Sequence, residues 1–112
     1  MMKRIEDACF FYGKVLNKRA ITIKATEEAG EIIQALSKLS LKFLSEELGE
    51  SFWVDESEEY YLLKVYEEMI DVYFMILQLK TTLGRNDIWD ELCLKKIERA
   101  EKRIDKKMKG EY

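Results

Sequence analysis

The chain has 112 residues, a length that suits one domain with one core and is too short for two. Its net charge of −3 excludes a global positive field that would draw it to nucleic acid or to a membrane surface. The sequence has no histidine, which excludes Ser-His and Cys-His nucleophiles and histidine-ligated metal sites. Acid, base or metal chemistry must therefore rest on carboxylates, lysines, tyrosines or water.

Apolar residues recur at helical spacing along most of the chain, and strand patterns are missing. Four helices are predicted, at about residues 3–16, 22–48, 55–83 and 86–109. Gly49 and Gly84 are the predicted stops of the second and third helices. The absence of proline suits long helices. The sequence therefore predicts an all-α, four-helix domain over residues 1–112, with long antiparallel helices.

Two helix starts carry capping signals. Asp55, with Glu58 three residues later, has the spacing of a capping box and predicts the start of the third helix. Asn86 or Asp87 is expected to cap the fourth helix. Residues 49–55 are predicted to form a loop.

The sequence predicts a cytoplasmic protein. Acidic residues precede any apolar run at the N-terminus, which is unlike a signal peptide, and no run of about 18 apolar residues occurs. Cys9 and Cys93 are isolated from each other and lack metal-type spacing, which is typical of reduced thiols.

A single charge interrupts an apolar stretch of the third helix. From Met69 to Leu77 eight of nine residues are apolar or aromatic, and Asp71 is the exception. A helix that is apolar on most sides is buried on most sides, and an unpaired buried carboxylate is costly. Glu68, one turn earlier, lies on the same face and adds repulsion unless a cation sits between the two.

The second helix carries a matching acidic cluster at residues 27–31. Glu28 and Glu31 stand at i and i+3 beside the apolar stripe, whereas Glu27 points toward the outer face. Gly30 lies in mid-helix, where glycine costs about 1 kcal/mol relative to alanine. We expect such a glycine where another backbone or a ligand approaches closely.

If the second and third helices pack antiparallel, Glu28, Glu31, Glu68 and Asp71 converge. Four carboxylates so close repel one another, and one or two Mg²⁺ or Mn²⁺ ions would relieve the repulsion, because hard cations prefer oxygen ligands. Each acidic pair alone is more often a solvated helix face. The two matching pairs together favour the metal site.

The order of these motifs resembles a known family. The clusters read Glu-Glu-x-x-Glu at residues 27–31 and Glu-Glu-x-x-Asp at residues 67–71, and a basic segment follows at residues 96–103. This resembles the MazG-like group of all-α nucleoside triphosphate pyrophosphohydrolases, related to dimeric dUTPases, dCTP pyrophosphatases and phosphoribosyl-ATP pyrophosphohydrolase. The resemblance covers about residues 10–106. The chain departs from the pattern in the long gap at residues 48–59 and in Ala100, where many members have asparagine.

The resemblance implies a nucleoside triphosphate substrate, cleaved by Mg²⁺-dependent hydrolysis between its α and β phosphates into a monophosphate and pyrophosphate. By the same match, Glu28, Glu31, Glu68 and Asp71 ligate the Mg²⁺, with Mn²⁺ as a substitute. A metal-bound water has a lowered pKa, and a nearby carboxylate accepts its proton. Glu27 and Glu31 are the candidate catalytic carboxylates, and Glu27 is equally suited to orienting a metal ligand.

Phosphate charge that the metal leaves unneutralised requires cations. Lys96, Arg99 and Arg103 recur at i, i+3 and i+7 on one face of the fourth helix and are the candidate phosphate-binding residues. The spacing alone favours a solvated basic face interleaved with Glu98, Glu101 and Asp105. The resemblance favours phosphate binding.

Base recognition is left open by the sequence. Four aromatic residues lie in or beside the long loop. An aromatic ring there is suited to stacking on a base, but such residues more often pack against helices. The four residues are Phe52, Trp53, Tyr60 and Tyr61.

The third helix has more apolar faces than four short helices cover, which predicts a homodimer or tetramer. Two other functions stay open. A non-catalytic helical metal-binding or interaction protein derived from the same family would keep the acidic site without turnover. Nucleic-acid binding through residues 95–109 is disfavoured, because acidic residues interrupt that segment and the net charge is negative.

Overall fold

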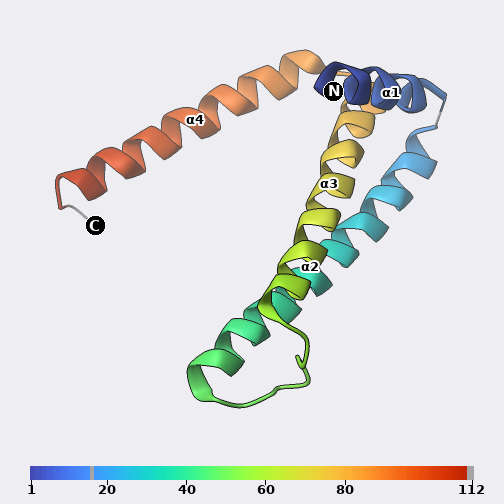
Figure 1. Ribbon diagram of the computed structural model, residues 1–112. Coiled ribbons are helices and arrows are strands. Elements are labelled where there is room, and N and C mark those ends of the chain that lie inside the picture. The colour runs from blue at the N-terminus through green and yellow to red at the C-terminus, as the bar shows by residue number, and fades with distance from the viewer. Residues whose placement is uncertain (16, 111–112) are drawn as a thin grey trace.

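Four helices make up the computed structural model, which describes residues 1–15 and 17–110, with side chains described outside 9–16. Their bounds are α1 Met2–Val15, α2 Lys18–Leu48, α3 Glu58–Leu83 and α4 Asn86–Met108 (Figure 1). No strand occurs among the described residues, so the all-α prediction is confirmed. The last residue of the predicted first helix, Leu16, lies outside the described residues.

The start of α2 differs from the prediction by four residues. Asn17 caps the helix, because its side-chain oxygen accepts a hydrogen bond of 2.7 Å from the N–H of Ala20. The helix then runs without interruption to Leu48. Gly49 ends it in the left-handed conformation, at φ 68°, as the sequence predicts, and donates its N–H to the carbonyl of Ser45.

Both predicted N-caps of the later helices are wrong. Ser57 caps α3 by accepting from the N–H of Tyr60 at 3.2 Å, whereas Asp55 accepts a hydrogen bond from Ser51 inside the loop. The cap position of α4 is Arg85, in the left-handed conformation and without a side-chain capping bond. Asp87 instead pairs with the Arg85 guanidinium at 3.1 Å, inside the first turn.

The core lies between α2 and α3, which form an antiparallel hairpin (Figure 1). Leu39 from α2 packs with Tyr61 and Val65 from α3, and Val54 from the connecting loop completes the cluster. Tyr61 and Val65 share one face of α3 at four-residue spacing, and Ala35, four residues before Leu39 on α2, packs against the same cluster. The helix α1 packs against α3 near the end of the hairpin where α3 finishes. None of the helices, over the residues described, is both long and apolar enough to cross a membrane.

Over the residues that the structure describes, the predicted packing of four helices into one bundle is not found. After Gly84, α4 turns away from the hairpin as an arm (Figure 1) and contributes no buried residue. The radius of gyration is accordingly 18.4 Å, against about 13 Å for a compact domain of this length. The direction of the arm follows from the left-handed Arg85, at φ 63°, directly after the positive φ of Gly84.

Much of the apolar surface of α3 is also left uncovered. Residues 62, 66, 69, 73 and 76 repeat at alternating four- and three-residue spacing on one side of the helix, and all five are exposed. We call this side the outer face of α3; it comprises Leu62, Tyr66, Met69, Tyr73 and Ile76. Such spacing is typical of a helix that packs along a further helix.

Candidate metal centre

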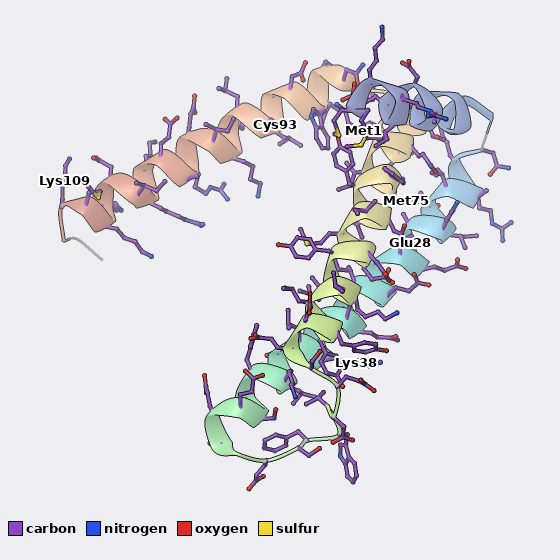
Figure 2. All side chains as sticks on the ribbon, viewed as in Figure 1. Met1, Glu28, Lys38, Met75, Cys93 and Lys109 are labelled. Carbon is purple, nitrogen blue, oxygen red and sulfur yellow. The ribbon has the colours of Figure 1, made fainter. Side chains whose placement is uncertain are left out.

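The four acidic residues singled out from the sequence lie together between α2 and α3. One carboxylate oxygen from each of Glu28, Glu31, Glu68 and Asp71 lies within 4.8 Å of the others. Glu28 stands on α2 where it runs alongside α3 (Figure 2). The site therefore takes one i, i+3 pair from each helix of the hairpin.

The local fold explains why these pairs meet. Glu28 lies seven residues after the fully buried Ile21, and Glu68 lies three residues after the buried Val65. The first residue of each acidic pair therefore lies on the side of its helix that faces the other helix. Antiparallel packing then brings the two pairs to the same edge of the hairpin. Glu31 and Asp71, one turn further along, are exposed at that edge.

Burial divides the cluster into an inner and an outer half. Glu28 and Glu68 are partly buried, and each has one side-chain oxygen shielded from solvent without a hydrogen-bond partner. A buried acceptor without a donor is costly, and the cost is higher for an ionised group. Glu31 and Asp71 face solvent, so a ligand reaches the cluster from their side.

The electrostatics of the cluster are unfavourable without a cation. Partial burial raises the pKa of Glu28 above its ordinary value of 4.5, and repulsion from Glu31 and Asp71 raises it further, whereas Lys24 opposes the shift. Burial and the same two neighbours also raise the pKa of Glu68. Both inner carboxylates therefore hold their protons more tightly than free glutamate does.

This donor set fits a hard divalent cation. All four groups offer oxygen, the two unpartnered oxygens lie inside, and the outer side stays open for water or a ligand. Mg²⁺ and Mn²⁺ prefer such ligands, and a dication would offset the mutual repulsion of the carboxylates. The chemistry available to such a site is the polarisation of a phosphate oxygen and the activation of water.

Other residues that the sequence singled out lie outside the cluster. Glu27 is exposed on α2 and supplies none of the four clustered oxygens. Lys96, Arg99 and Arg103 lie exposed on the α4 arm, which leads away from the hairpin (Figure 1), so this chain does not bring them to its own carboxylates.

No other backbone approaches Gly30 closely within the described residues, as far as the single chain goes. A Cβ built on this residue would have nothing within 4 Å. Within the described part of the chain, no neighbouring backbone therefore requires a glycine there.

Sequence reasoning missed a pocket beside the cluster. A cavity of about 490 Å³ lies between α2, the loop at residues 49–57 and the start of α3, and Glu31 and Glu68 line part of it. Lys38, Lys64 and Trp53 also line it. Spacing would have found the lysines, because Lys38 follows Glu31 by seven residues and Lys64 precedes Glu68 by four, on the same helix faces.

Of the four aromatic residues in or beside the loop, two pack in or against the core and two are exposed. Tyr61 is buried in the core, and Phe52 packs against that core while lining the pocket. Trp53 is 95% exposed, and Tyr60 is also exposed; both line the pocket.

Compared with known proteins, the chain matches no protein-family model, and neither a curated protein nor a solved structure matches it.

Proposed function

We propose that this chain is a magnesium-dependent nucleoside triphosphate pyrophosphohydrolase, which converts a (d)NTP to the (d)NMP and pyrophosphate. The observation that carries the proposal is the cluster of four carboxylates, whose oxygens lie within 4.8 Å of one another. Two buried oxygens without partners favour a bound cation over a solvated acidic face. The reaction class comes from the motif order and its resemblance to MazG-like proteins.

In this proposal Glu28, Glu31, Glu68 and Asp71 hold Mg²⁺, or Mn²⁺ in its place. When bound, the ion lowers the pKa of a coordinated water and neutralises adjacent phosphate oxygens. The partly buried Glu28 and Glu68 fix the inner side of the site. The exposed Glu31 and Glu27 are the candidates to accept the proton of the water that attacks the α-phosphorus as the bond to pyrophosphate breaks.

The proposed phosphate-binding residues of α4 bind the substrate held by another copy of the chain. Lys96, Arg99 and Arg103 lie on an arm directed away from their own hairpin (Figure 1). Arginine and lysine stabilise the charge that develops on transferring phosphates only when they lie beside it. These three residues therefore belong to the proposal only together with a homo-oligomer.

The accessible surface supports such an oligomer. The chain exposes 9213 Å², which exceeds the roughly 6,500 Å² expected for a compact monomer of its mass by about 2,700 Å². The outer face of α3 and the apolar residues of the arm contribute to this excess. A second copy packed on the outer face would cover it, as in a homodimer or a dimer of dimers. We place this oligomer in the cytoplasm, because the two separated cysteines suit a reducing compartment.

The proposal is tested by pyrophosphate release from a panel of NTPs and dNTPs in the presence of Mg²⁺. We expect release from at least one nucleotide, and a loss of about 100-fold or more in kcat with Glu31→Gln or Asp71→Asn. Glu47→Gln on α2 and Asp90→Asn on α4 are matched controls, because each removes an exposed carboxylate outside the cluster. Circular dichroism checks that the helices persist in every variant.

Wild-type rates in both cluster variants would contradict the proposed roles. No release from any nucleotide, with divalent-cation binding intact, would instead favour a non-catalytic metal-binding protein derived from the same family.

A further inference from the structure

The pocket beside the carboxylates has the size and lining of a binding site. Its volume of about 490 Å³ lies within the range of roughly 300–1,000 Å³ that is usual for small-molecule sites. Glu31 and Glu68 line it together with aromatic residues of the loop and of α3. A molecule bound there through a metal ion at the carboxylates would therefore extend toward the aromatic side chains.

The loop that forms one wall is anchored to the hairpin. Val54 is buried in the core cluster, and its carbonyl accepts a hydrogen bond of 3.2 Å from the Lys42 ammonium. Two residues on, the N–H of Glu56 donates to the Tyr61 hydroxyl at 3.3 Å. These contacts fix the loop on the C-terminal side of Trp53.

The anchored loop presents Trp53 to solvent. The indole is 95% exposed, although tryptophan is the largest apolar side chain in the chain and three neighbours in the loop and on α3 pack inward. The backbone adopts the left-handed conformation at both Phe52, φ 50°, and Trp53, φ 65°, which is unfavourable for residues with a Cβ. An aromatic face held open at the edge of a pocket suits stacking by a planar ring.

Two lysines line the same pocket as the carboxylates and the aromatic residues. Lys64 contacts the Tyr60 ring, with its nitrogen 5.5 Å from the ring centroid, and lies 3.8 Å from a carboxylate oxygen of Glu67. Lys38, from α2, forms no ion pair within the described part of the chain. The lining thus combines an acidic end with basic and aromatic side chains.

We propose that this pocket binds the base-bearing part of a nucleotide, with the base stacked on Trp53 and with Lys38 and Lys64 neutralising its phosphates. This inference rests on the proposed function for the phosphates held at the carboxylates. The ligand class is an anion that carries an aromatic ring. Inorganic polyphosphate shares the charge of such a ligand and lacks the ring, so it engages the lysines and not Trp53.

Intrinsic fluorescence provides a direct test, because Trp53 and Trp89 are the two tryptophans of the chain. In a Trp89→Phe protein with Mg²⁺, the emission of Trp53 is recorded during titration with α,β-methylene-ATP, α,β-methylene-CTP or inorganic tripolyphosphate. We expect both nucleotide analogues to quench the emission and tripolyphosphate to leave it unchanged. By calorimetry, Trp53→Ala weakens nucleotide binding by about 5- to 100-fold and leaves tripolyphosphate binding unaltered.

The lysines are tested by the same titrations. Lys38→Met weakens both the nucleotide analogues and tripolyphosphate, and added salt reduces the difference between variant and wild type. Lys18→Met, on the first turn of α2, is the matched control and leaves both affinities unchanged. Trp53 and Lys38 are exposed, so their replacement leaves the helical content intact.

Nucleotide affinity that survives Trp53→Ala overturns the proposal, as does the absence of any binding by the analogues. The same measurements distinguish failure of the pocket proposal from failure of the hydrolase proposal. Quenching of Trp53 without pyrophosphate release supports nucleotide binding in the pocket and contradicts the hydrolase activity. Pyrophosphate release with unquenched Trp53 supports the hydrolase activity and contradicts stacking of the base on Trp53.

Discussion

A lysine in place of Met69 tests whether the outer face of α3 is covered by a second copy. Met69 is the central residue of this face and is 48% exposed in the isolated chain. Lysine is a good helix former and would be solvated there, so the monomer should keep its fold. In a two-fold dimer packed through this face, each interface would carry two buried ammonium groups without partners.

The size of the effect follows from the surface involved. A dimer that covers half of the excess of about 2,700 Å² on each chain buries about 2,700 Å² in total, an area typical of obligate homodimers. Leaving one buried charge without a partner costs roughly 3 to 5 kcal/mol, so the two ammonium groups of the interface together cost about 6 to 10 kcal/mol. The dissociation constant should therefore rise by about four to seven orders of magnitude.

Sedimentation equilibrium over a wide range of protein concentration measures this change. Wild-type protein should have at least the mass of a dimer, and Met69→Lys should shift toward the 13.3 kDa monomer. Ser37→Lys is the control, because it adds the same charge at an exposed position on the side of α2 that faces away from Leu39 and the core. A monomeric wild-type protein, or equal masses for wild type and Met69→Lys, would refute the reasoning.

Two further predictions concern stability. Gly30→Ala should raise the free energy of unfolding, measured by urea denaturation, by about 1 kcal/mol, because a Cβ there meets nothing within 4 Å and alanine favours the helix. A destabilised variant would instead reveal a close neighbour that the single chain lacks. In EDTA, the melting temperature should fall as the pH rises from 4.5 through the raised pKa values of Glu28 and Glu68, because over that window the folded state binds more protons than the unfolded state. Calorimetry with Glu28→Gln should show a shallower dependence on pH, and an unchanged slope would argue against the electrostatic description of the cluster.

The parts of the fold set by local spacing were predictable from the sequence. Apolar periodicity gave the four helices, and Gly49 and Gly84 end α2 and α3 as expected. Helix starts were less predictable, because several polar residues compete for each cap. Ser57 caps α3, whereas Asp55 accepts a hydrogen bond from Ser51 in the loop that the buried Val54 anchors.

The carboxylate cluster was predictable for the same reason as the helices. Two i, i+3 pairs beside apolar stripes can meet when their helices pack antiparallel in a suitable register, and α2 and α3 pack in such a register. The orientation of α4 was not predictable, because it follows from two consecutive positive φ angles at Gly84 and Arg85. The pocket was not predictable either, since it depends on how Val54 and Lys42 fold the loop back onto the hairpin.

Binding of Mn²⁺, followed by electron paramagnetic resonance, tests the central claim most directly, since it needs neither a substrate nor turnover. We predict that wild-type protein binds Mn²⁺ saturably, that excess Mg²⁺ displaces it, and that Glu68→Gln loses the binding while Glu47→Gln retains it. Equal Mn²⁺ affinity in wild type and Glu68→Gln, with helical content unchanged, would contradict the claim that these four carboxylates form a metal site.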